Sequence, residues 1–297
     1  MPELPEVETI RRQLEPEIAG RRIERLEVLD GRWSRPVAPA ELERAVSGRR
    51  IEGLGRRGKY LLLALERGET LVMHLRMTGN FVLVEGGAAE PHLRARFELD
   101  DGRELRFTDA RRFGEAFLVG DADLEARFER LGVEPLSDEF TPEALGARAA
   151  GRVVPLKSFL LDQSHIAGIG NIYADEALFR ARLHPLSPAG SMRPEHLVAL
   201  RDAVVEALEA GLAHGGASID DYRDGRGEMG EMQDEFLVHT REGEPCPSCG
   251  GQKIARIVIS GRSTYYCPSC QVRLRRRRRP ARRRRPARRR RPARRST

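Results

Sequence analysis

Two cysteine pairs constrain the fold of this chain more than any other feature of its sequence. They are Cys246-Pro-Ser-Cys249 and Cys267-Pro-Ser-Cys270, separated by 17 residues, and they include every cysteine of the 297-residue chain. A CxxC turn places two thiolates on one side of a knuckle, so two knuckles supply the four sulfurs of a tetrahedral zinc site. Redox-active pairs or unrelated buried cysteines fit this spacing less well. We therefore predict one Zn²⁺, with a structural role because four protein ligands leave no open position for catalysis.

The segment between the pairs, KIARIVISGRSTYY, predicts a two-stranded hairpin that turns at Ser260-Gly261 and presents Arg262 at its tip. The N-terminus carries three glutamates before residue 9 and lacks the apolar run of a secretion signal. We therefore expect a cytoplasmic, reducing environment, which disfavours disulfides. No run of about 18 apolar residues occurs, so we expect no transmembrane helix.

The rest of the chain changes from strand patterns to helix patterns, which indicates an α+β fold. Residues 1–18 predict a helix, because apolar residues recur every three or four positions at Leu4, Val7, Ile10, Leu14 and Ile18. Between residues 22 and 120, short β-type runs predict a sandwich or a barrel; they are RIERLEVLD, KYLLLALE, TLVMHLRM, RARFELD, ELRFTD and EAFLVG. Residues 121–215 have helical spacing, and EHLVALRDAVVEALEAGL predicts the longest helix.

The net charge of +7 comes from the C-terminal tail and not from the body of the chain. Residues 275–297 hold 15 arginines and no acid, whereas the other 37 basic residues stand against 45 acidic ones, a net of −8. Adjacent like charges and frequent prolines predict that this arginine-rich tail is disordered. It is either low-complexity sequence without an ordered role or a salt-sensitive anchor for nucleic acid. A binding surface in the body must then be a local cluster of charge.

The proline at position 2 is a candidate nucleophile. Methionine is normally removed before small residues, which leaves Pro2 with a free secondary amine. Such an amine is largely unprotonated near its pKa and can attack an electrophilic carbon to give an iminium ion. Glu3 and Glu6 lie beside it as acid–base candidates. On these residues alone, a proline that starts a helix, with glutamates at the positive helix end, is the simpler interpretation.

Six segments change that balance, because together they carry a family resemblance. In order along the chain they are PELPEVE, RRGKYLLL, HLRMTG, TDARRFG, DQSHIAGIGNIYADEALF and GEPCPSCG followed by GRSTYYCPSCQ. The chain resembles bacterial formamidopyrimidine-DNA glycosylase, a family that excises oxidised purines such as 8-oxoguanine. The matching segments span residues 2–271, nearly the whole chain outside the tail.

The resemblance implies an N-terminal β-sandwich, a helix–two-turn–helix module and a zinc-finger hairpin. Residues 216–235, which are polar and rich in glycine and acid, correspond to the loop that closes over the flipped base, and we call them the capping loop. The predicted organisation is a catalytic β-sandwich domain at 1–120, connecting helices at 121–150, the helix–two-turn–helix domain with its capping loop at 151–235, the zinc-finger hairpin at 236–274 and the disordered tail at 275–297.

The resemblance also implies two-stage chemistry. The amine of Pro2 would attack the sugar C1′, with Glu3 as the acid that helps to open the deoxyribose ring and Glu6 in support. β-Elimination would then expel the 3′ phosphate with Lys59 as general acid, and δ-elimination would expel the 5′ phosphate with Arg262 as the assigned general acid. A guanidinium with a pKa above about 12 does not readily give up a proton, so we expect Arg262 to bind the departing phosphate.

A glycosylase cannot reach a base inside the stack, so the damaged nucleotide must be flipped out. The resemblance assigns Met77, Arg111 and Phe113 to the space left behind, a task that suits apolar wedges and a planar cation. Phosphate contacts supply affinity and position the enzyme. The residues that match the family's phosphate contacts are His92, Lys157 and Asn171.

The sequence therefore predicts a bifunctional DNA glycosylase and abasic-site lyase that acts in base excision repair. We expect a bacterial, cytoplasmic monomer that binds double-stranded DNA with oxidised bases or abasic sites and uses zinc as its only cofactor. The related endonuclease VIII group, which prefers oxidised pyrimidines, usually begins PEGPE, whereas Leu4 and the RRF triplet favour the purine enzyme. A non-catalytic zinc-containing DNA-binding protein is a third interpretation, against which the retained Pro2, Glu3, Lys59 and Arg262 argue.

Overall fold

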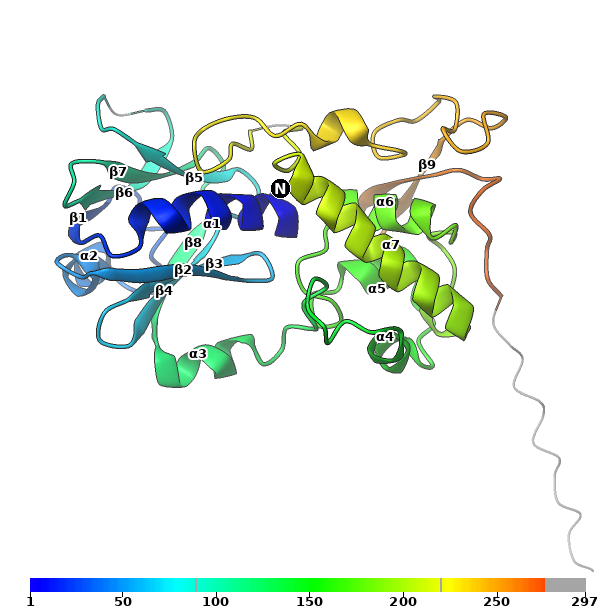
Figure 1. Cartoon of the computed structure of the whole chain (residues 1–297), viewed down its shortest axis with the longest axis horizontal. Coiled ribbons are helices and arrows are strands. Elements are labelled where there is room, and N and C mark those ends of the chain that lie inside the picture. Colours follow the sequence, from blue (N-terminus) through cyan, green and yellow to red (C-terminus); the bar gives the residue numbers. More distant parts are fainter. Residues whose placement is uncertain (89, 220, 276–297) are drawn as a thin grey trace, which may run out of the picture.

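The computed structural model describes residues 1–88, 90–219 and 221–275, and it confirms the predicted α+β class. Figure 1 shows one half built mainly of strands and one half built mainly of helices, with the N-terminus where the two halves meet. The predicted disorder of the arginine-rich tail concerns residues that, except for Arg275, lie outside the described part of the chain. None of the helices in the described residues combines the length and the apolar character that a bilayer-spanning helix requires.

Two antiparallel four-stranded sheets form a sandwich in the N-terminal half. Of the two architectures that the sequence predicted, a sandwich or a barrel, the structure therefore has the sandwich. The strand orders of the two sheets are β1-β6-β7-β5 and β2-β3-β4-β8. Edge-to-face contacts of Phe97 with Trp33 and Phe81 help to fill the core between them. The strands are β1 (Ile23–Val28), β2 (Ile51–Arg57), β3 (Tyr60–Leu65), β4 (Glu69–His74), β5 (Gly79–Val84), β6 (Leu93–Leu99), β7 (Glu104–Asp109) and β8 (Glu115–Gly120).

Helix α1 (Leu4–Ile18) joins the two halves of the molecule. All five apolar residues of its predicted face are buried. Four of them belong to the core of the sandwich, whereas Leu4 belongs to the core of the helical half. The first turn of α1 therefore lies between the halves, which places the N-terminal residues there. A second helix, α2 (Pro39–Val46), packs against β1.

The helical half is organised around α6 (Asn171–Arg180) and α7 (Pro194–Ala213). The 20 residues of α7 match the helix predicted to be the longest, and α6 packs against both α7 and the C-terminal hairpin. The other helices of this half are α4 (Pro142–Ala149) and α5 (Leu156–Leu161), whereas α3 (Asp121–Phe128) packs against β4 and β8 of the sandwich. Two 3₁₀ turns complete this half, η1 (Ala189–Ser191) and η2 (Met232–Glu235).

The C-terminal hairpin consists of β9 (Ala255–Ile259) and β10 (Arg262–Tyr266), as the sequence predicted. The strands pair antiparallel with Arg262 opposite Ile259. The connecting residues Ser260 and Gly261 both have positive φ angles, 49° and 74°, which the tight turn requires. Because β10 packs against α6, the hairpin holds Arg262 beside the start of that helix.

Candidate active site

Two neighbouring cavities meet at the N-terminus of the chain. The first cavity, of about 320 Å³, is lined by Glu3, Met77, Asn171 and residues of the capping loop. The second cavity, of about 270 Å³, is lined by Lys59 and by other residues of the two halves. Met1 lines both cavities, so its removal would leave the nitrogen of the buried Pro2 at the wall that the cavities share.

Glu3 is fixed at the start of α6. Its side-chain oxygens accept hydrogen bonds from the backbone N–H groups of Gly170 at 2.7 Å, Ile172 at 3.0 Å and Tyr173 at 3.4 Å. The start of a helix presents N–H groups without partners in the helix, so these three bonds hold the Glu3 side chain in one orientation. Gly170 is required here, because a Cβ on it would lie 2.2 Å from the Glu3 carboxyl carbon.

Glu6 connects three parts of the site. Its carboxylate accepts hydrogen bonds from the Glu3 N–H at 2.7 Å, the Tyr173 hydroxyl at 2.7 Å and the Ala217 N–H at 2.9 Å. The first belongs to the N-terminus, the second to α6 and the third to the capping loop. Burial, and secondly the charge of Glu3, raises the pKa of Glu6. The structure therefore gives two adjacent glutamates different environments.

Lys59 lies on the turn between β2 and β3, with only 7% of its surface exposed. Within the described residues its ammonium has no ion pair and no hydrogen bond. Burial lowers the pKa of Lys59, and the negative charges of Glu3 and Glu6 oppose this shift. The turn is held by Glu134, which accepts hydrogen bonds at 2.8 Å from the guanidinium groups of Arg56 and Arg57. Lys59 is thus a desolvated amine on a fixed support.

The second cavity contains functional candidates that the sequence did not single out. His74, Arg76 and Tyr60 line it together with Lys59 and Arg262, and its lining includes no carboxylate. Burial, followed by the charges of Arg76 and Lys59, lowers the pKa of His74 to about 3. Its Nδ1 accepts the Arg76 N–H at 2.9 Å, which also requires an unprotonated nitrogen. In the sequence, the histidine of the HLRMTG segment was the available signal for these candidates. Lys59, Arg76 and Arg262 make the cavity positively charged, so it can accept a phosphate.

Arg262 and Asn171 come together although 91 residues separate them in the sequence. The Asn171 side-chain amide donates to the carbonyl of Ser263 at 3.1 Å, which ties the start of α6 to β10. Arg262 is exposed and lines both cavities. The structure therefore brings Pro2, Glu3, Lys59 and Arg262 to one place. The roles predicted for these residues stay predictions.

Lys157, which the sequence predicts to contact a phosphate, is buried in the structure. Its side chain has no exposed surface, and its ammonium donates to Asp175 at 2.6 Å and to the carbonyl of Asn171 at 2.8 Å. Asp175 also contacts Nδ1 of His239 at 2.9 Å. Burial lowers the pKa of Lys157, and the charge of Asp175 opposes that shift. In this arrangement Lys157 connects α5 to the start of α6.

The three residues expected to fill the space of a flipped base lie at the ends of two paired strands. Met77 precedes β5 and Arg111 follows β7, and Gly79 pairs with Asp109 where these strands meet. Met77 is 38% exposed and Phe113 53% exposed, which is unusual for large apolar side chains. The Arg111 guanidinium lies 5.0 Å from the centre of the Phe113 ring.

The predicted phosphate contact His92 lies beside the same end of β7. It is exposed on the turn before β6, where its backbone has a positive φ of 65°. Its carbonyl accepts the Asp109 N–H at 2.9 Å. This bond fixes the turn next to the end of β7.

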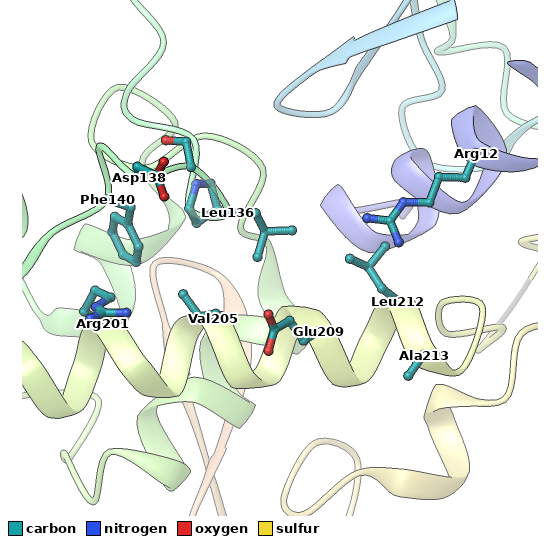
Figure 2. A pocket seen from close by; sticks show the side chains of 11 residues that line it. Arg12, Leu136, Asp138, Phe140, Arg201, Val205, Glu209, Leu212 and Ala213 are labelled. Carbon is teal, nitrogen blue, oxygen red and sulfur yellow. The ribbon is translucent and has the colours of Figure 1, made fainter.

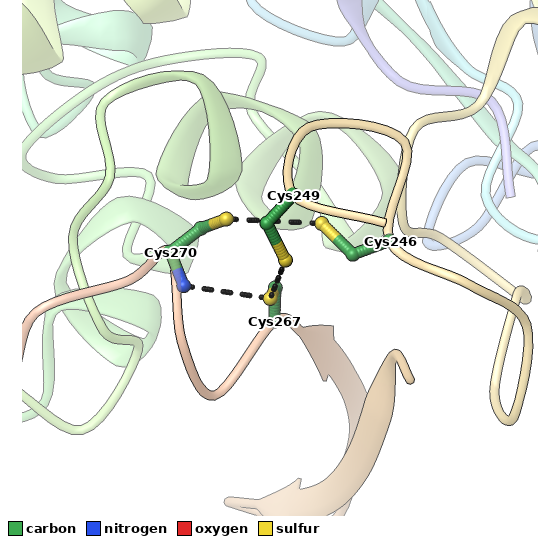
Figure 3. A group of neighbouring side chains, drawn as sticks. All are labelled: Cys246, Cys249, Cys267 and Cys270. Carbon is green, nitrogen blue, oxygen red and sulfur yellow. Dashed lines mark hydrogen bonds between the residues drawn. The ribbon is translucent and has the colours of Figure 1, made fainter. Parts of the chain in front are cut away.

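The four cysteines form one cluster at the base of the hairpin (Figure 3). All four sulfur atoms lie within 4.8 Å of one another, and two of the sulfur–sulfur distances are 3.8 Å. A tetrahedron with Zn–S bonds of about 2.3 Å has sulfur–sulfur edges of about 3.8 Å, so the cluster fits one Zn²⁺. The predicted ligands are therefore confirmed as a structural zinc site. It supports the hairpin and hence the position of Arg262.

A wider cavity, of about 600 Å³, lies away from these residues, between α1, the segment 135–140 and α7. Figure 2 shows Arg12 reaching from α1 toward Leu212 and Glu209 of α7. No residue predicted to act on DNA lines this cavity. Its size alone therefore does not make it the active site.

Three family models match the chain in the order of its structural parts. Residues 1–116 match the formamidopyrimidine-DNA glycosylase N-terminal domain, and residues 131–223 match the H2TH domain of the same enzymes. Residues 243–272 match a zinc finger found in FPG and IleRS. This combination defines a DNA glycosylase.

Whole-chain relatives agree with the family models. The formamidopyrimidine-DNA glycosylase of Chloroflexus aggregans is 48% identical over 92% of this chain and 99% of its own length. The Roseiflexus enzyme of the same name is 46% identical over 91% of this chain and all of its own. The Lactococcus lactis Fpg in complex with abasic-site DNA has a TM-score of 0.85 and 33% identity, covering 91% of this chain and 99% of its own. The chain belongs to the formamidopyrimidine-DNA glycosylase family.

Proposed function

We propose that this enzyme excises oxidised purines from double-stranded DNA and then cleaves the abasic strand. The proposal is supported by the position of Pro2 beside two cavities, one lined by the fixed side chain of Glu3 and the other by the desolvated Lys59, whose ammonium has no partner within the described residues. A solved relative, the wild-type Lactococcus lactis Fpg (MutM), is bound to DNA that contains N7-benzyl-Fapy-dG. We propose that the enzyme works as a monomer.

The first stage joins enzyme and sugar. The Pro2 amine forms a bond to C1′ while the bond from C1′ to the damaged base breaks and the base leaves with the bonding electrons. The bonded Pro2 nitrogen then loses its proton to Glu3, and Glu3 passes this proton as an acid to the ring oxygen while the C1′–O4′ bond breaks, which gives an iminium ion at C1′. The carboxylate of Glu3 stabilises the positive charge that develops at this point, since the α6 N-terminus holds it in place. Glu6, whose pKa is raised, is the neighbouring group better suited to keep a proton.

The second stage cleaves the strand by two eliminations. The iminium acidifies C2′, so loss of a C2′ proton expels the 3′ phosphate, and loss of a C4′ proton later expels the 5′ phosphate. Lys59 exchanges protons at this centre, because its lowered pKa brings its ammonium closer to the working pH. Arg262 lines both cavities and binds the departing phosphate through its fork of donors.

Oxidised pyrimidines are the second candidate substrates, as the endonuclease VIII alternative requires. A specific observation keeps this candidate: another Lactococcus lactis Fpg structure, with a TM-score of 0.84 and 33% identity, contains an oxidised pyrimidine in its DNA. The capping loop of this chain is also rich in acidic residues, of which Asp221 lines the first cavity. Reaction type is therefore better supported than lesion preference.

The test is strand cleavage of three matched duplexes that carry 8-oxoguanine opposite cytosine, thymine glycol, or an abasic site. We expect faster cleavage at 8-oxoguanine than at thymine glycol, with phosphate on both sides of the gap after β,δ-elimination. Preference for thymine glycol would favour the pyrimidine enzyme. DNA binding without cleavage of any duplex would favour the non-catalytic interpretation.

A further inference from the structure

The capping loop, which belongs to the helical half, is held by two amide side chains of the other half. The first is Gln13 on α1. Its Oε1 accepts the Gly225 N–H at 2.8 Å, and its Nε2 donates to the Asp224 carboxylate at 2.7 Å. Both polar atoms of this side chain are therefore used on the loop.

The second amide is Asn80 on β5, which is 8% exposed. Its Nδ2 donates to the carbonyl of Asp221 at 2.9 Å, and its Oδ1 accepts the Arg223 N–H at 2.8 Å. Next to it, the Leu83 N–H donates to the carbonyl of Gly225 at 3.0 Å, so the loop also bonds to the backbone of β5. Gln13 and Asn80 thus act as a latch of two side chains.

The loop itself is shaped to receive this latch. The Asp224 carboxylate, 6% exposed, accepts the N–H groups of Arg226 and Glu228, each at 2.9 Å, through the oxygen that Gln13 does not use. Asp224 therefore organises the turn and binds the latch at the same time. A buried carboxylate with all its partners satisfied holds one conformation.

The latched segment forms a wall of the first cavity. Ile219, Asp221 and Tyr222 line that cavity opposite Glu3 and Met77. Ile219 is 44% exposed, which leaves an apolar side chain free to contact a base. The distance between this wall and the sugar site therefore depends on the latch.

We propose that Gln13 and Asn80 are positioning residues that hold the capping loop against the flipped base and thereby control base excision. This inference rests on the proposed function. An abasic site has no base for the loop to contact, so strand cleavage at an abasic site does not need the latch. The ratio of the two activities is then the property that the latch determines.

The hydrogen-bond pattern allows an exchange experiment. In Gln13→Glu a carboxylate faces the Asp224 carboxylate, which breaks one bond and adds repulsion. In the double variant Gln13→Glu/Asp224→Asn the amide and the acid have changed places, so both bonds can form again. Asn80→Leu removes the second half of the latch. Gln252→Glu is the matched control, since Gln252 is exposed and its side chain has no hydrogen bond within the described residues.

Single-turnover rates are measured on an 8-oxoguanine duplex and on an abasic-site duplex. We expect Gln13→Glu and Asn80→Leu each to slow base excision about tenfold, as loss of hydrogen bonds worth about 1–1.5 kcal/mol predicts, with abasic-site cleavage unchanged. The exchanged pair should recover the base-excision rate. An equal fall in both activities, or no recovery in the double variant, would overturn the proposal.

Amide hydrogen exchange supplies a readout that does not depend on activity. The latch bonds directly to the N–H groups of Arg223 and Gly225, so the peptide 221–228 should lose protection in Gln13→Glu and regain it in the exchanged pair. Unchanged protection would contradict the latch. Failure of the unmodified enzyme to excise 8-oxoguanine while this protection pattern holds would instead contradict the proposed function.

Discussion

Two regions of this molecule bury a lysine, and they do so in opposite ways. In the turn between β2 and β3, Lys59 is 7% exposed and has no partner for its ammonium within the described residues. At the start of α5, Lys157 is fully buried, with its ammonium bonded to Asp175 and to the carbonyl of Asn171. The third lysine of the chain, Lys253, is exposed.

The contrast between the two lysines indicates how a buried lysine with a chemical role differs from one that only stabilises the fold. Burial lowers the pKa of both lysines, but only Lys157 has a carboxylate within bonding distance to restore the charged form. A buried charge is normally paired, so an unpaired one beside a cavity indicates function. We therefore expect Lys59 to take part in the chemistry and Lys157 to stabilise the start of α6.

The largest expected effect is on catalysis at Lys59. Lys59→Met should reduce strand cleavage at an abasic site by about 10²–10⁴-fold, the usual contribution of a proton-transferring group. The fold should be retained, because no partner loses its charge. Cleavage rates and thermal unfolding test both parts, with Lys253→Met as the control. A variant that cleaves at the normal rate would remove Lys59 from the mechanism.

The next effect is on stability at Lys157. Lys157→Met should lower the free energy of unfolding by about 3–5 kcal/mol, because Asp175 stays buried without its cation. Lys157→Met/Asp175→Leu should recover part of this loss in denaturant titrations. Unchanged stability together with weaker, less salt-dependent DNA binding would contradict this account and would favour the direct phosphate contact expected from the sequence.

The smallest effect is a pH dependence near Lys59. His74 has a folded-state pKa of about 3, against about 6.5 when unfolded, so the unfolded chain binds more protons between these values. The stability that His74 contributes is present above pH 6.5 and is lost as the pH falls below it, by about 2 kcal/mol at pH 5. His74→Gln should flatten this part of the stability profile in urea titrations. An unchanged slope would show that the cavity accepts a positive charge on His74 in addition to its other cations.

The sequence predicted the fold where periodicity or spacing was regular. All six runs proposed as strands are strands, and the CxxC spacing defined the zinc site. Two strands and one helix were missed. β2 contains two glycines and ends in two arginines, and β5 begins directly after a turn, so neither alternates clearly. α2 is only eight residues long, too short for a periodic pattern.

The site was predictable in its residues but not in their environments. Matching segments named Pro2, Glu3, Lys59 and Arg262, which the structure brings together. The spacing of residues in the sequence does not show that Lys157 bonds to Asp175. It also does not show that Gln13 bonds to Asp224, 211 positions further along the chain. Such contacts depend on how the two halves pack, which local sequence patterns do not report.

In the proposed mechanism the Pro2 amine forms the covalent bond to the sugar. Reduction with borohydride during reaction with an 8-oxoguanine duplex traps an iminium as a stable protein–DNA complex. We predict a trapped complex with the processed enzyme, greatly weakened in Pro2→Gly and in protein that retains Met1. An equally strong complex in protein that retains Met1 would contradict this assignment and would leave another amine of the cavities, that of Met1 or of Lys59, as the nucleophile.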